Sequence, residues 1–318
     1  MLSLNELARR RCDILAEHFA ERMHVHAGVL KMDSGARVID CGVNATGGLE
    51  IGRQLAEICL ADLGRVSFAP GHADLWPGMM VAIQTDQPVA ACMASQYAGW
   101  QITGDKFFAM GSGPMRAAAG KETLFDKIGY RETTAHAVGV LETSKLPPDE
   151  VCRQIAADCK VEPANLTLLA ARTASIAGSV QVVARTVETA LHKLHELGFD
   201  ISWVQSGYGV APLPPIAKDD LAGIGRTNDA VLYGGEVTLW VRGADESLAA
   251  VGPKIPASAS QDYGEPFAAI FERSGRDFYK IDPLLFSPGV VNLVNLDSGK
   301  SYRFGKLRPD VLRKSFAA

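Results

Sequence analysis

The chain has 318 residues and a formal net charge of −4, with 32 Lys and Arg against 36 Asp and Glu. Hydrophobic residues make up 47% of it and charged residues 21%, a balance that excludes a disordered chain. The slight acidity also argues against nucleic acid as a partner, because duplex binding needs a basic face that displaces counterions. At roughly 100–200 residues per domain, the length corresponds to one large domain or two closely packed ones.

The N-terminal segment predicts a cytoplasmic protein. Ser3 and Glu6 form a capping box in front of an amphipathic helix, and charges spread through the segment leave no apolar core for a signal peptide. No stretch approaches the ~18 apolar residues of a membrane span, so no membrane partner is expected. The six cysteines include no CxxC pair and are expected to be reduced, buried side chains.

Strand and helix patterns alternate along the chain without a repeat, which predicts an α/β fold with mixed sheets and flanking helices. The expected strands are 25–32, 37–43, 79–85, 135–142, 165–171 and 236–242. The expected helices are 48–63, 88–100, 148–159, 179–198, one from Asp219 and one around 266–273. A final hairpin is expected to turn at Asp297-Ser298-Gly299. Residues 211–215 (APLPP) are either a crossing between lobes or an ordinary loop.

Common catalytic signatures are missing from the sequence. The nearest approach to GxGxxG is Gly111-Ser-Gly113-Pro-Met-Arg116, and no P-loop, HExxH or GxSxG occurs. His24 and His26 are spaced as two metal ligands can be, but no third ligand follows at a clear spacing, which favours a surface or turn pair. The chemistry is therefore expected to use ordinary side chains, without a metal or redox cofactor.

Four segments rich in glycine and small residues are difficult to explain by packing alone. They are residues 44–48 (NATGG), 91–101 (ACMASQYAGWQ), 107–117 (FFAMGSGPMRA) and 233–240 (YGGEVTLW). Small residues let a planar ligand approach the backbone, and N–H groups at a helix start favour an anionic or carbonyl edge. Each segment taken singly can equally be only a turn.

These segments, in this order and at these spacings, resemble the methenyltetrahydromethanopterin cyclohydrolases. The matching motifs are NATGGLEIGRQLAEICLADLG, ACMASQYAGWQI, FFAMGSGPMRA, YGGEVTLWV and IDPLLFSP, and they cover nearly the whole chain. The resemblance implies one cyclohydrolase unit over residues 1–318, with two α/β lobes that enclose a substrate cleft. It implies reversible hydrolysis of 5,10-methenyltetrahydromethanopterin to the 5-formyl compound in one-carbon metabolism. It also implies a cytoplasmic homotrimer that binds a pterin substrate and needs no cofactor.

The resemblance assigns the catalytic roles to an Arg and a Glu three positions later, and Arg185 and Glu188 are the only such pair in the chain. At 100° per residue, both lie on one face of the expected helix 179–198. They belong to a polar stripe beside its apolar stripe, made of Gln181, Arg185, Glu188, His192 and His195. Without the resemblance, a surface ion pair is the better interpretation.

The methenyl carbon is cationic between two nitrogens, so it needs only an oriented water molecule and a base. Glu188 is the expected base, and Arg185 is expected to orient its carboxylate and favour the ionised form. Once protonated, Glu188 can return the proton to a ring nitrogen. His192 and His195 are alternatives for that step, although a solvent-exposed position is favoured for both.

Pterin recognition has several candidate residues. A carboxylate can accept hydrogen bonds from the amide and amino edge of a pterin on two atoms, which points to Glu236 and Asp282. Each of the two can equally cap a turn or form a local salt bridge. Further polar contacts from the loops can come from Asn44, Ser95, Gln96 and Ser112.

Two other functions stay open. A methenyltetrahydrofolate cyclohydrolase would use a Tyr and Lys pair; Tyr302 and Lys306 have the YxxxK spacing, but on a hairpin strand and without a Rossmann motif. A non-catalytic pterin-binding protein would use the same pocket, and the presence of both Arg185 and Glu188 argues against it.

Overall fold

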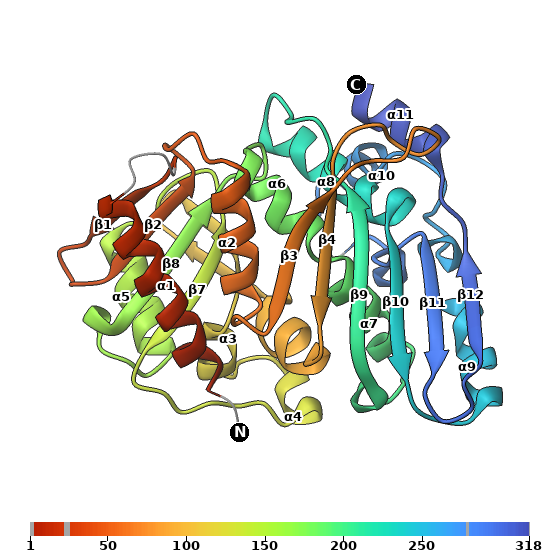
Figure 1. The fold of residues 1–318 in the computed structure, drawn as a ribbon. Coiled ribbons are helices and arrows are strands. Elements are labelled where there is room, and N and C mark those ends of the chain that lie inside the picture. Colours follow the sequence, from red (N-terminus) through yellow and green to blue (C-terminus); the bar gives the residue numbers. More distant parts are fainter. Residues whose placement is uncertain (1–2, 22–25, 278–279, 318) are drawn as a thin grey trace. The chain divides into compact units, whose positions relative to one another are not determined.

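The computed structural model describes residues 3–21, 26–277 and 280–317 of the chain (Figure 1). The chain forms two compact units, one of Met1–Gly64 and Ala90–Gln181 and the other of Arg65–Val89 and Val182–Ala318. It passes from one unit to the other three times, so neither unit is a continuous segment. This explains why no single linker marks a boundary in the sequence.

The first unit is built on a mixed sheet of six strands in the order β1-β2-β8-β7-β6-β5. Its three central strands β2, β8 and β7 are parallel, and the outer strands pair antiparallel. The strands are β1 (Gly28–Lys31), β2 (Arg37–Gly42), β5 (Trp100–Gly104), β6 (Phe107–Ser112), β7 (Ala137–Glu142) and β8 (Leu166–Ala171). The helices are α1 (Leu4–Glu21), α2 (Leu49–Cys59), α3 (Met115–Ala119), α4 (Leu124–Ile128), α5 (Asp149–Asp158) and most of α6 (Ile176–Val183), and a π-helix spans Val89–Gln96.

The burial of strand β8 reflects the coverage of this sheet by helices on both faces. All six of its residues are buried, as is typical of a parallel strand with helices on each side. Leu168 packs into a core with α3 and α5, whereas its neighbour Leu169 packs into a second core with α1 and α2. All six cysteines are buried, as expected, and none forms a disulfide within the described ranges. Burial raises the pKa of the Cys12 thiol to about 12.

The second unit holds another six-stranded sheet, in the order β12-β11-β10-β9-β4-β3. β10 and β11 are parallel, whereas β4 with β9, β9 with β10 and β11 with β12 are antiparallel. The strands are β3 (Gly64–Ala69), β4 (Met80–Thr85), β9 (Val204–Pro212), β10 (Glu236–Val241), β11 (Val290–Asn295) and β12 (Ser301–Gly305). The helices are α7 (Thr186–Glu196), α8 (Asp220–Gly234), α9 (Asp245–Val251), α10 (Phe267–Arg273) and α11 (Pro309–Ala317).

The α/β class with mixed sheets is confirmed, but two local predictions are wrong and one of two open alternatives is excluded. The expected helix 179–198 is two helices, α6 and α7, separated at Ala184 and Arg185. The expected helix 88–100 is a shorter π-helix, and three irregular residues separate it from strand β5. Residues 211–215 lie within the second unit, so they are not a crossing between units. Of the first expected strand, Val25 lies outside the described residues.

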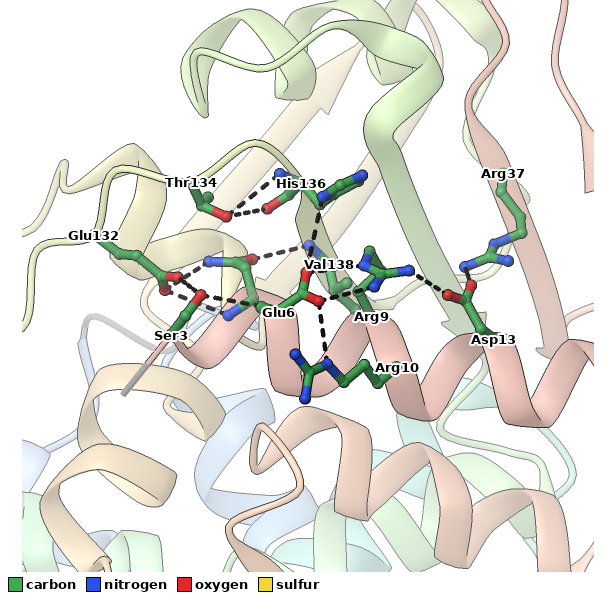
Figure 2. A network of polar contacts seen from close by, with 11 residues as sticks. Ser3, Glu6, Arg9, Arg10, Asp13, Arg37, Glu132, Thr134, His136 and Val138 are labelled. Carbon is green, nitrogen blue, oxygen red and sulfur yellow. Dashed lines mark hydrogen bonds and ion pairs between the residues drawn. The ribbon is translucent and has the colours of Figure 1, made fainter. Parts of the chain in front are cut away.

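Helix α1 is held in the first unit by a polar network (Figure 2). The Ser3 Oγ accepts a hydrogen bond from the Glu6 N–H at 3.3 Å, which confirms the Ser3 half of the predicted capping box. The Glu6 carboxylate pairs with Arg9 and Arg10 instead of bonding back to the start of the helix. The fully buried Asn5 donates from Nδ2 to the Pro114 carbonyl at 2.9 Å and to Glu132 at 3.0 Å. Its Oδ1 accepts the N–H of Val138, at the start of β7, at 2.9 Å. One side chain therefore joins α1 to the sheet and to two loops.

Asn5→Ala is expected to lower the free energy of unfolding by about 2–4 kcal/mol, because it leaves the buried Val138 N–H without its acceptor. Urea unfolding followed by circular dichroism measures the change. Arg10→Ala is the control, since the Arg10 side chain is 67% exposed and its ion pair with Glu6 should contribute less than about 0.5 kcal/mol. Equal losses in the two variants would contradict the prediction.

Candidate active site

The break between α6 and α7 gives Arg185 its position. Arg185 is the N-cap of α7, with φ −84° and ψ 7°, in the sparsely populated bridge region where many active-site residues lie. Its N–H donates to the Val182 carbonyl at 3.1 Å, and its own carbonyl accepts the N–H of Thr189 at 2.8 Å. Glu188 follows in the first turn of α7, where the helix dipole favours a negative charge.

Arg185 and Glu188 form a buried ion pair. The residues are 7% and 4% exposed, and the nearest atoms, Nη1 of Arg185 and Oε2 of Glu188, are 3.9 Å apart. The surface ion pair that the sequence alone favours is therefore not what the structure shows. A separation of 3.9 Å exceeds the ~3.2 Å limit of a direct hydrogen bond between the two groups. Both can then approach a common third atom, such as a water oxygen.

Two glycines of β9 bring α7 close to the second sheet. A Cβ on Gly207 would lie 2.7 Å from Cγ1 of Val187, and one on Gly209 would lie 3.1 Å from Cβ of Thr186. Only glycine allows this approach without displacing the first turn of the helix. The sequence predicts no strand here, although the alternation of Gly207 and Gly209 is the signal that one face of a strand is covered closely.

The rest of α7 is more buried than the sequence suggests. His192 has only 16% of its side chain exposed, and burial lowers its pKa despite the opposing effect of Glu196, 3.7 Å away. The favoured solvent-exposed position is therefore wrong for His192, whereas His195 is half-buried. Lys193 is fully buried and donates from Nζ to the Leu284 carbonyl. Burial lowers the pKa of Lys193 to about 8, against the opposing charge of Asp282.

Glu236 and Asp282 both show the local roles that the sequence left open. Asp282 caps a short turn by accepting the N–H of Leu284 at 3.0 Å, and it accepts the Ser260 hydroxyl at 2.6 Å.

Glu236 accepts hydrogen bonds from Asn292 on the neighbouring strand β11 and from Arg303 on β12, one strand further away. Burial acts to raise the pKa of Glu236, but these two hydrogen bonds outweigh it and the pKa is lowered. Glu236 also lines a cavity of about 390 Å³ in the second unit, together with His72, Met80 and Val210.

In the first unit, the backbone N–H groups at the start of the loop that contains Asn44 are hydrogen-bonded to a side chain of the same unit. The carboxylate of the buried Asp40 accepts N–H groups from residues 42–45 at 2.7–3.0 Å. These amides are therefore already occupied by an anion of the chain itself, whereas the Asn44 side chain is exposed. Nothing in the sequence pattern singles out Asp40, which lies within the buried strand β2, two residues before that strand ends at Gly42.

The structure brings Ser95, Gln96 and Ser112 together around Cys59. The Ser95 hydroxyl donates to the Cys59 carbonyl at 2.6 Å, and the Ser112 hydroxyl lies 3.3 Å from Sγ of Cys59. The Gln96 carbonyl accepts the same thiol at 4.0 Å. All three candidates are fully buried.

The fully buried Arg116 fixes the segment that carries two of these candidates. Its guanidinium donates to the carbonyls of Met93 and Ser95 and pairs with Glu122. In the sequence, Arg116 stands out only as the last residue of the Gly111–Arg116 motif, which predicts no role for it.

Neither a metal site nor a membrane-spanning helix is found among the residues that the structure describes. No group of three or more His, Cys, Asp or Glu side chains is arranged there to hold a metal ion. None of the helices described is both long and apolar enough to cross a bilayer. Of the histidine pair, His24 lies outside the described residues, and His26 is exposed with Nδ1 3.0 Å from the Thr46 hydroxyl.

The chain is thus an α/β scaffold with an Arg–Glu pair buried at a helix break, and a carboxylate in such a pair is chemically able to accept a proton. The comparison with known families is specific: the model of the family described as Cyclohydrolase (MCH) matches residues 3–316. The chain belongs to this family, and the resemblance drawn from its motifs is confirmed.

The chain is similar to several proteins that carry the name methenyltetrahydromethanopterin cyclohydrolase. One from Rhodopirellula baltica is 51% identical over 288 residues, which are 89% of this chain and 86% of the relative. One from Methylobacillus flagellatus is 48% identical over 289 residues, 91% of this chain and 88% of the relative. One from Methanosarcina barkeri is 44% identical over 321 residues, 99% of this chain and 98% of the relative.

The buried Lys193 predicts a pH-dependent contribution to stability. Because its pKa falls from the usual 10.5 to about 8 on folding, the unfolded chain holds more protons than the folded chain between these pH values. The stability of the wild type relative to Lys193→Met should therefore rise with pH from about 8 to 10.5, by at most ~1.4 kcal/mol per pH unit. Urea unfolding of both proteins at several pH values measures the difference.

The comparison of two proteins cancels the titration of groups that both contain. Lys314→Met, which removes an exposed lysine of α11, is the matched control for the loss of one positive charge. A difference for Lys193→Met that stays flat with pH, or that equals the one for Lys314→Met, would contradict the prediction.

Proposed function

We propose that the chain is an enzyme that catalyses the reversible hydrolysis of 5,10-methenyltetrahydromethanopterin to 5-formyltetrahydromethanopterin in one-carbon metabolism. The observation that carries the proposal is the buried Arg185–Glu188 pair at the start of α7, in a chain whose relatives bear the name of this reaction. The family membership supports the reaction, and the pair supplies residues suited to it.

Glu188 is the proposed base. The carboxylate takes one proton from a water molecule as the water oxygen forms a bond to the cationic methenyl carbon. The resulting carbinolamine then opens: its hydroxyl proton leaves as the formyl group forms, and the carbon–nitrogen bond breaks. The leaving nitrogen keeps the electron pair and takes the proton that Glu188 holds, so one proton is released overall. The same carboxylate stabilises the bound substrate cation beforehand.

Arg185 is the proposed orienting group. At 3.9 Å from Glu188 it can fix the carboxylate while both groups reach one water molecule. No metal or redox cofactor is needed in this proposal, because the substrate carbon is already a strong electrophile.

For pterin recognition we propose the loops that carry Asn44, Ser95, Gln96 and Ser112. Asn44 is exposed, so its side chain can reach a ligand. The other three residues are buried and would support the wall of the pterin site from behind. Glu236 and Asp282 are weaker candidates, because both already accept local hydrogen bonds. A cytoplasmic homotrimer is proposed from the resemblance of the motifs alone.

The substrate assay is the test of the proposed reaction. With methenyltetrahydromethanopterin, the purified protein should accelerate the loss of the methenyl absorbance well above the rate in buffer. Methenyltetrahydrofolate, tested separately, should decay more slowly, and a faster decay would favour the folate reaction. Binding of either compound without decay would instead favour a pterin-binding protein without activity.

Glu188→Gln should lower kcat by about 100-fold or more while substrate affinity changes little, because the amide keeps the shape of the base but cannot take the proton. Steady-state kinetics and a separate binding titration measure the two effects. Glu196→Gln is the matched control, since Glu196 is an exposed carboxylate on the same helix.

Near wild-type turnover in Glu188→Gln would contradict the assignment of the base. Arg185→Ala distinguishes two roles of the arginine: a loss in kcat supports orientation of Glu188, whereas a change confined to affinity would make Arg185 a substrate clamp.

A further inference from the structure

Thr186 lies between Arg185 and Val187, at the point where α6 and α7 separate. Its hydroxyl donates to the Val183 carbonyl, the last residue of α6, at 2.8 Å. A threonine hydroxyl that bonds back to the preceding turn offers the backbone an alternative to regular helix and often bends it. The hydroxyl of Thr186 is therefore placed where it can stabilise the break.

The other side of Thr186 is fixed against the second sheet. The residue is fully buried, and a Cβ on Gly209 would lie 3.1 Å from Cβ of Thr186 and 3.2 Å from its methyl carbon. The methyl group thus rests on the bare backbone of β9 while the hydroxyl points to α6. A β-branched side chain held at both ends has a single rotamer, which limits the backbone on either side of it.

The contacts of Thr186 on both sides keep the backbone of Arg185 out of the regular helical conformation. Its ψ of 7° differs by about 50° from the −42° of regular α-helix. If residues 184 and 185 relaxed into regular helix, the Arg185 side chain would leave from a different direction and its distance to Glu188 would change.

We propose that Thr186 is a positioning residue that holds the helix break and thereby the geometry of Arg185 relative to Glu188. The proposal rests on the proposed function, because it concerns the same pair. Thr186 acts through the backbone of Arg185, and its hydroxyl is engaged with Val183 rather than with substrate.

The experiment compares Thr186→Val, which loses the hydroxyl but keeps the shape, with Thr186→Ser, which keeps the hydroxyl. Thr186→Val should lower kcat at least ~10-fold with KM changed little, since small displacements of catalytic groups cost this much. Thr186→Ser should recover kcat to within about 3-fold of wild type. A role confined to stability would not produce this recovery together with an unchanged KM.

Thr227→Val is the matched control. Thr227 is fully buried on α8 and its hydroxyl also bonds back, to the Gly223 carbonyl at 2.9 Å. Its loss should lower the melting temperature about as much as Thr186→Val does and leave kcat unchanged. If Thr186→Val does not fold, Thr186→Ala replaces it, and Thr186→Ser should be at least ~10-fold more active than Thr186→Ala.

The outcomes separate this proposal from the proposed function. Wild-type kcat in Thr186→Val, with Glu188→Gln inactive, would overturn the role of Thr186 and leave the function standing. An inactive wild-type protein would overturn the function itself. Equal losses of kcat in Thr186→Val and Thr186→Ser would also overturn the proposal, because the hydroxyl would not be what matters.

Discussion

The close packing of α7 on β9 is the contact on which the candidate site depends. A helix can approach a strand this closely only where the strand lacks side chains, and Gly207 and Gly209 provide that on one face of β9. Val187 and Thr186 fill the space above them. Arg185 and Glu188 flank these two buried residues in the sequence, so the apolar contact with the sheet also determines where the two charges lie.

Buried charges elsewhere in the chain show how the candidate pair differs. Asp40 accepts four N–H groups, and Arg116 donates to two carbonyls and a carboxylate at hydrogen-bond distance. Such arrangements hold a loop in one shape. Arg185 and Glu188 are also buried, but their nearest atoms are 3.9 Å apart. A buried ion pair adds little net stability even at close range, so the separation within this pair is compatible with the proposed catalytic role of its two residues.

The sequence predicts well where one signal dominates. The strands β7, β8 and β10 are continuous apolar or alternating runs, and Gly299 marks the turn of the final hairpin. It fails where two signals compete. The 3.6-residue period continues across Ala184 and Arg185, so it hides a break made by the Thr186 hydroxyl. The glycines of β9 resemble loop residues, although their purpose is to admit a helix. The three passages between the units depend on contacts distant in sequence, which no local pattern records.

The same limit applies to the candidate site. The spacing of Arg185 and Glu188 places them on one face of a helix, and the resemblance singles them out, but only packing determines that they are buried. The roles of Lys193 and Asp40 cannot be predicted from the sequence, because their hydrogen-bond partners, a carbonyl and a set of backbone N–H groups, are brought to them only by the fold.

Position, more than basicity, is what the proposed reaction requires of its base. A cationic carbon accepts water readily, so a carboxylate suffices if it is held at the correct place. Helix α7 is anchored accordingly at both ends. Its first turn is held by Thr186 and by its contact with the β9 glycines. Its second half is held by Lys193, whose ammonium group donates a hydrogen bond to the Leu284 carbonyl. Burying that lysine costs free energy, as its lowered pKa indicates. The contact that causes this cost lies on the helix that carries Glu188, and it restrains that helix against movement along the sheet.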